Sequence, residues 1–201
     1  MALSLTTAPT VEPVTLAEVK AHLHIDHTAD DDYIEDFVIP AARRYAETFT
    51  RRAFLQQTWT LKWGGFGADP IVVPRPPLSS VTSITYLDSN GDSQTWASTK
   101  YTIEAPSGEY AQHGQVWLAY GQSFPTTRGV VNSVTVTFVA GYGTAATSVP
   151  VGIKHGVFML CEDLYRQRGS AIVGTIISQA LITAERLLMP FRCERYDLRF
   201  D

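Results

Sequence analysis

The chain is poor in the features that would place it outside the cell or in a membrane. Only two of its 201 residues, Cys161 and Cys193, are cysteines. Two are too few for a disulfide framework, so we predict buried thiols in a reducing compartment. No run approaches the roughly 18 apolar residues of a membrane-spanning helix. The start, MALSLTTAPTVEP, lacks the basic residues and apolar core of a signal peptide. We therefore expect a soluble, cytoplasmic protein without membrane contact.

Positive charge is also scarce. Sixteen Lys and Arg residues stand against 20 Asp and Glu, which gives a formal net charge of −4. This balance argues against a sequence-independent grip on nucleic acid, because such binding needs clustered basic residues. Apolar residues make up 45% of the chain, enough for the core of one domain, or of one domain with a substantial insertion.

Motifs of common enzymes are missing. The sequence contains no GxGxxG, GxxxxGK[ST], GxSxG, HExxH or CxxC. His113 and His155 are isolated, and neither has a nearby Ser, Cys or Asp arrangement typical of nucleophilic catalysis. We therefore predict that the protein is not an enzyme and uses no cofactor.

The best metal-like cluster is His22, His24, Asp26 and His27, followed by Asp30–Asp32. Imidazole and carboxylate are suitable zinc ligands. In a helix, however, residues two apart point to different faces, which separates His22 from His24. We favour solvated polar residues at a helix junction over a metal site.

Both ends of the chain show the three- and four-residue hydrophobic spacing of amphipathic helices. Thr15 precedes Glu18 by three residues, the spacing of a helix capping box. Pro40 lies within the next helical stripe and predicts one bent helix, with two consecutive helices as the alternative. Pro150 opens a later helix, and a last helix ends at Pro190.

Between residues 54 and 147 the pattern changes to short runs rich in Val, Ile, Thr and aromatics. In SVTVTFVA, every second residue from Val134 is apolar up to Phe138, the period of a half-buried strand. Asn90-Gly91 separates two such runs and predicts a hairpin. We predict an α+β protein: a helical domain of about four helices, residues 14–53 and 148–191, with an inserted antiparallel sandwich- or barrel-like β-domain, residues 54–147.

The run Pro74-Arg75-Pro76-Pro77 has the PxxP spacing of ligands for SH3-type grooves. Such ligands usually lie in disordered proline-rich tracts, whereas this run stands between two strand patterns. Since proline cannot donate a hydrogen bond to a sheet, we predict that these residues link two strands.

The four tryptophans suggest a rival function. Trp59, Trp63, Trp96 and Trp117 would suit a stacking surface of a carbohydrate- or single-stranded nucleic-acid-binding β-module. Few basic residues accompany them, so core or interface packing is favoured.

The C-terminal residues 192–201 combine basic and aromatic side chains, the composition of interface anchors. An ordinary tail that lies on its own helices explains the composition equally well. The candidate docking residues are Phe191, Arg192, Arg195, Tyr196, Arg199 and Phe200.

The order of these pieces resembles the head–tail connector (adaptor, or head-completion) proteins of tailed bacteriophages and phage-derived gene transfer agents, in the subset with a β-insertion. The stretches that carry the resemblance cover roughly residues 14–195: VTLAEVKAHLHID, DDDYIEDFVIPAARRYAETFTRRAF, QTWTL, PRPPLSSVTSITYLDSNG, VTFVAGYG, VPVGIKHGVFMLCEDLYRQRG and LLMPFR. Pro40 and the longer tail after MPFR depart from the family pattern.

The resemblance implies a structural virion protein at the head–tail interface, assembled in the bacterial host cytoplasm. It implies a homo-oligomeric ring of about twelve copies beneath the portal protein. The helical part would make the ring, and the C-terminal segment would reach the portal. A tail-side stopper or head-completion protein would bind the other side, and DNA would pass through the channel without specific binding.

Overall fold

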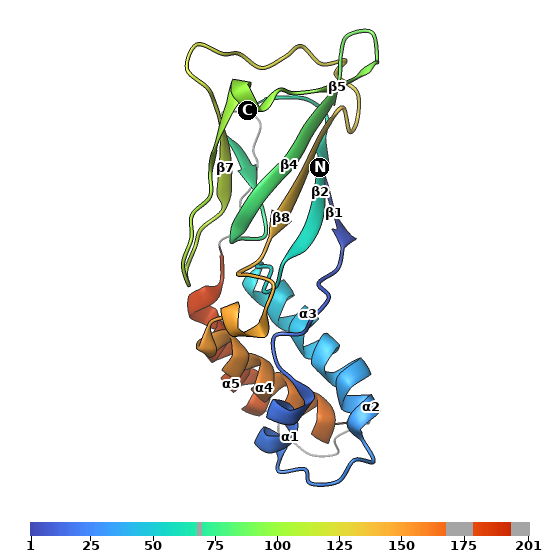
Figure 1. Ribbon diagram of the computed structural model, residues 1–201, viewed down its shortest axis with the longest axis vertical. Helices are drawn as coiled ribbons and strands as arrows, with labels where there is room; N and C mark the ends of the chain where they lie inside the picture. Colours follow the sequence, from blue (N-terminus) through green and yellow to red (C-terminus); the bar gives the residue numbers. More distant parts are fainter. Residues whose placement is uncertain (68–69, 168–178, 194–201) are drawn as a thin grey trace.

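The protein is elongated, with its helices at one end and its strands at the other (Figure 1). The computed structural model describes residues 1–67, 70–167 and 179–193. The helices are α1 (Leu16–Leu23), α2 (Asp31–Tyr33), α3 (Ile39–Thr50), α4 (Val151–Arg166) and α5 (Gln179–Leu188), with a π-helix, η1 (Ile34–Val38), between α2 and α3. Three short 3₁₀ turns are η2 (Ser98–Lys100), η3 (Ala146–Ser148) and η4 (Met189–Phe191). None of the described helices is long and apolar enough to cross a membrane.

In the described part of the chain, eight strands form two antiparallel sheets. The strands are β1 (Ala2–Thr7), β2 (Gln57–Trp63), β3 (Ile71–Val73), β4 (Leu78–Leu87), β5 (Ser93–Thr95), β6 (Tyr101–Glu104), β7 (Gly114–Leu118) and β8 (Val134–Ala140). One sheet has the order β1-β2-β8-β4-β5 and the other β3-β7-β6. This arrangement confirms the predicted α+β fold with an antiparallel sandwich.

The β-core lies between the two sheets. Alternate residues of β8 are buried, as its period of two predicts. Val136 and Phe138 of the larger sheet pack in one cluster with Val73 and Val116 of the smaller one. The predicted hairpin joins β4 to β5, and Gly91 in its turn has φ 95°, a conformation that glycine adopts readily.

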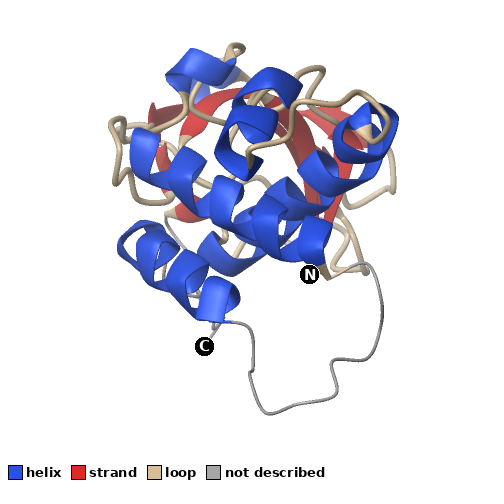
Figure 2. Cartoon of the chain, turned by 90° about the horizontal axis from the view of Figure 1, so that it is seen from below, coloured by secondary structure: helices blue, strands red, loops and turns tan. Residues whose placement is uncertain are grey.

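The helices form a layer beneath the sheets, seen from the helical end in Figure 2. The predicted capping box starts α1: the Glu18 N–H donates to Thr15 Oγ1 at 3.2 Å, and the Thr15 N–H donates to Glu18 Oε2 at 2.8 Å. Lys154 of α4 pairs with the same Glu18 at 2.8 Å and thereby fixes α1 to α4. Helices α4 and α5 approach closely at Gly156, which faces Leu188.

Pro40 does not interrupt the second helical segment. The backbone remains helical from Asp31 to Thr50, and the adjustment takes the form of the π-helix that directly precedes α3. The Ile39 N–H donates to the Ile34 carbonyl, five residues back. Pro40 then falls in the first turn of α3, where its missing N–H is tolerated.

Strand β1 was not predicted from the sequence. It pairs with β2 along the edge of the larger sheet, with Leu3 opposite Leu61 and Leu5 opposite Trp59. All six of its residues are exposed. The signal for a strand is weak here because the run is short and nothing nearby in the sequence indicates its partner.

Candidate functional site at the junction of helices and sheets

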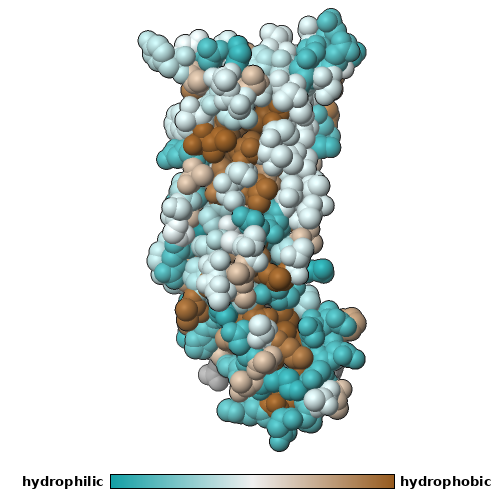
Figure 3. Space-filling model, in the orientation of Figure 1, coloured by the Kyte–Doolittle hydropathy of each residue, from teal (hydrophilic) through white to brown (hydrophobic). Residues whose placement is uncertain are grey.

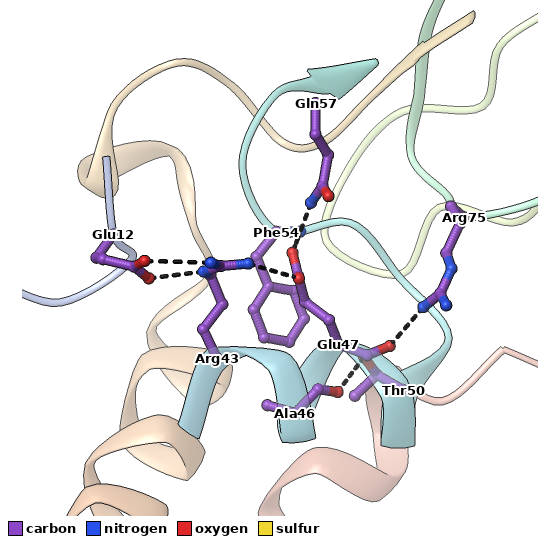
Figure 4. Close-up of polar contacts among 8 residues, drawn as sticks. All are labelled: Glu12, Arg43, Ala46, Glu47, Thr50, Phe54, Gln57 and Arg75. Atoms are coloured by element: carbon purple, nitrogen blue, oxygen red, sulfur yellow. Dashed lines mark hydrogen bonds and ion pairs between the residues drawn. The ribbon is translucent and has the colours of Figure 1, made fainter. Parts of the chain in front are cut away.

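A buried ion network joins the helices to the sheets (Figure 4). Arg43 of α3, only 6% exposed, donates to Glu12 through Nε at 2.6 Å and through Nη2 at 3.2 Å. Its Nη1 donates to Glu47 Oε2 at 3.0 Å. Burial opposes the charge of Arg43, but the hydrogen bonds and charges of the two carboxylates outweigh it and raise the pKa of the guanidinium. The pair with Glu12 also fixes the segment that follows β1.

Glu47 connects α3 to the start of β2. Its Oε1 accepts hydrogen bonds from the backbone N–H of Phe54 at 2.9 Å and from the Gln57 side chain at 2.7 Å. Three donors therefore satisfy one buried carboxylate, a condition that such a charge requires inside a protein. This side chain therefore links α3 to the chain that enters β2.

The proline run lies between β3 and β4, as predicted, and leads from the smaller sheet to the larger one. Arg75 within it has φ 62°, which is unusual for a residue other than glycine. Its Nη1 donates to the Glu47 carbonyl at 3.0 Å, near the end of α3, and its guanidinium lies 5.0 Å from the centroid of the Trp59 ring. Burial lowers the pKa of Arg75.

On the other side of α3, Arg52 anchors two separate segments. This fully buried side chain donates through Nε to the Phe191 carbonyl and through Nη1 to the Ala111 carbonyl, the latter at 2.6 Å. The Cys193 N–H donates to the Thr50 carbonyl at 3.0 Å. The C-terminal segment is therefore held by the end of α3 up to Cys193.

The predicted docking residues divide into three groups. Phe191 is only 3% exposed and stacks on Tyr110 with 5.3 Å between ring centroids, so its side chain belongs to the protein's own core. Arg192 is exposed and lies over Phe49, 5.4 Å from the ring centroid. The remaining four lie outside the described residues: Arg195, Tyr196, Arg199 and Phe200.

The histidine cluster is dispersed. His22 stacks on Phe158 and lies 3.4 Å from Glu162, while His24 ends α1 with φ 56°. Within the described residues, no group of three or more His, Cys, Asp or Glu side chains is placed to hold a metal ion.

The tryptophans are not gathered on one surface. Trp63 and Trp96 are buried in the β-core, and Arg75 covers Trp59. Trp117 is 40% exposed and donates to Glu104 at 3.1 Å. This distribution does not provide the row of exposed rings that a stacking surface requires.

Both cysteines are buried free thiols, as predicted. Burial raises the pKa of Cys161 to about 12, and it also raises the pKa of Cys193, where Arg52 and Arg51 act in the opposite direction. Neither thiol has the low pKa that a nucleophilic cysteine needs.

The described residues therefore hold a buried structural network, and hydrophobic side chains gather in several patches on the face shown in Figure 3. Residues 13–111, from before α1 to the loop between β6 and β7, match the family model described as phage gp6-like head-tail connector protein. The resemblance to the head–tail connectors is confirmed. A search of curated proteins finds no match.

Solved structures share the fold over the whole chain. A chain in the virion of a native gene transfer agent (GTA) particle matches with a TM-score of 0.78 and 20% identity, and both chains are fully covered. A chain in the neck of an empty GTA particle, computed with C6 symmetry, gives 0.77 and 21%, again with full coverage of both chains. A chain in the neck of a native GTA particle, computed with C12 symmetry, gives 0.71 and 20% over the same extent.

Proposed function

We propose that the protein is a structural subunit of a phage or gene transfer agent particle. It forms a ring beneath the portal protein and joins the DNA-filled head to the tail. The observation that carries this proposal is the fold match along the entire chain to chains of a GTA virion and of GTA particle necks, together with the connector family match. The neck computed with C12 symmetry favours a ring of twelve copies.

The C-terminal residues 192–201 are proposed to dock on the portal, and the helical domain, residues 14–53 and 148–191, to make the ring. The contacts of Cys193 with the end of α3 support the docking role, because they fix the position of Cys193, the residue just before 194–201. Arg192, exposed and beside this point, is the first residue available for such a contact. A tail-side protein would bind the other side of the ring.

The charge of the chain suits a channel through which DNA passes. A net charge of −4 gives no reason for tight phosphate binding, which would slow the passage of DNA. The described residues also show no row of exposed tryptophans that would favour the rival binding module.

The test is a truncation placed after the last anchored residue. Deleting residues 194–201 leaves Phe191 and Cys193 in their buried positions, so the domain should fold with unchanged circular dichroism. We expect the truncated protein to lose attachment to purified heads that contain portal. A variant in which Arg192 alone becomes Ala should attach more weakly. Full attachment of the truncated protein would refute the docking role of the tail.

A further inference from the structure

A hollow at the junction is lined by positive and aromatic side chains. Its volume is about 250 Å³, and it lies between the segment that follows β1, the last turns of α3 and strand β2. Its walls include Arg44, Thr48, Trp59 and Arg75. Arg44 and Thr48 are exposed, so the hollow can be reached from solvent.

The charges around this hollow are not balanced within the described part of the chain. Arg43 is paired with both Glu12 and Glu47. Arg75 donates to the Glu47 carbonyl and lies against the Trp59 ring. The charge of the Glu47 carboxylate also acts on Arg75, but the ion pair of Glu47 is with Arg43, and no ion pair of Arg44 is found among the described residues. A partly buried guanidinium is stabilised by a carboxylate, so the hollow suits an acidic group from outside.

An acidic and aromatic projection lies elsewhere at the same junction. The loop between β6 and β7 (residues 105–113) exposes Glu109 and Tyr110, the latter by 54%. The loop backbone is fixed: the Tyr142 hydroxyl donates to the Glu109 carbonyl at 2.7 Å, and the Arg52 side chain donates to the Ala111 carbonyl. A projection that is already ordered loses little conformational entropy on binding.

The hollow and the loop lie on different sides of the molecule. Arg44 and Thr48 face the hollow from α3, whereas Arg52, just after α3, holds the loop. Figure 1 shows β1 and β2 on one flank and β7 on the other. A ring of more than two copies joins unlike surfaces of neighbouring subunits, and these two surfaces are unlike and opposite in charge.

We propose that the hollow beside Arg44 and Arg75 receives Glu109 and Tyr110 of a neighbouring copy. This inference rests on the proposed ring. The Glu109 carboxylate would pair with the two guanidinium groups, and the Tyr110 ring would lie near Trp59. Through this contact the β-domain would also join neighbouring subunits of the ring, which the helical domain is proposed to form.

A neighbouring copy fits this hollow better than DNA does. Duplex DNA is held by rows of exposed Lys and Arg along its phosphates. Here three arginines, Arg43, Arg44 and Arg75, line a small hollow together with the acidic Glu47.

A charge exchange tests the contact. Each variant is supplied to a particle-producing strain that lacks its own copy, and the protein retained on purified particles is quantified. R44E and E109R should each lower retention on the order of tenfold, since a lost interface charge pair is replaced by repulsion. The combined variant R44E/E109R should recover most of the loss. Matched controls are K100E and D92R, which change exposed charges of the β-domain that line neither the hollow nor the loop.

Three outcomes would overturn the contact: normal retention of R44E, a combined variant no better than the single ones, or duplex DNA binding in solution that R44E abolishes. If even the unchanged protein is missing from particles, the proposed function itself fails, which is a distinct result.

Cross-linking gives a second readout. T48C/E109C treated with a short bis-maleimide should yield a ladder of oligomers from particles, whereas dimers alone would contradict a head-to-tail contact.

Discussion

Glu47 accepts the backbone N–H of Phe54 at 2.9 Å, so a side chain of α3 holds the chain at the point where it enters the larger sheet. The two residues are seven positions apart in sequence, and the end of the helix lies between them. This hydrogen bond places the β-domain on the helices, and the same carboxylate also pairs with Arg43. Glu47 therefore holds the junction together with Arg52 and Arg75.

Replacing Glu47 with Gln should destabilise the protein strongly. The change leaves the buried Arg43 with one carboxylate fewer, and removal of one partner of a buried pair typically costs about 3–5 kcal/mol. Urea unfolding followed by circular dichroism measures the difference in the free energy of unfolding. E35Q, which alters an exposed glutamate, is the control and should change stability little. A loss below about 1 kcal/mol in E47Q would show that the network contributes little.

Gly156→Ala should push α5 away from α4 and lower the stability of the protein. An added Cβ would lie 2.7 Å from Leu188 side-chain atoms, and overpacking of this kind costs about 1–3 kcal/mol. G64A is the matched control, because its Cβ would meet its nearest atom at 3.6 Å. Thermal unfolding compares the stability of G156A and of G64A with that of the unchanged protein. In a double-mutant cycle with L188A, the cost of G156A should shrink; equal costs in both backgrounds would contradict the proposed clash.

Stability should fall with acid partly through Glu18. The hydrogen bond from Lys154 lowers the pKa of Glu18; burial opposes this shift, and the bonds from Thr15 add to it. Since the folded pKa lies below the usual 4.5, this contribution is present above that value and is lost as the pH falls through the folded pKa. Urea unfolding between pH 7 and pH 3 should therefore show a shallower acid dependence for E18Q. An identical slope in E18Q and the unchanged protein would argue against the shift.

Neither cysteine should react readily with thiol reagents in the folded protein. Burial raises the pKa of Cys161 to about 12, and Cys193 is also buried, so little thiolate is present or accessible at pH 8. Titration with a chromogenic disulfide reagent should label neither thiol natively and both in denaturant. The denatured sample is the control. Rapid native labelling of C161S would show that the segment around Cys193 opens in solution.

The local elements of the fold could be predicted from the sequence because their signals are local. The Thr15–Glu18 capping box, the alternation in β8 and the Asn90-Gly91 turn each depend on residues that are close in sequence. The order of helical and strand patterns also predicted the α+β class. The connector resemblance followed from the joint order of these elements, and the family match confirms it.

Tertiary structure alone decided which residues meet at the junction. Glu12 and Arg43 are 31 residues apart, and Arg52 reaches carbonyls 59 and 139 residues away. No spacing rule predicts such pairs, since the path of the chain through two sheets brings them together. The sequence alone placed Phe191 among the docking residues, whereas the structure buries it against Tyr110, which is also distant in sequence. Strand β1 likewise exists because β2, some 50 residues later, offers it an edge.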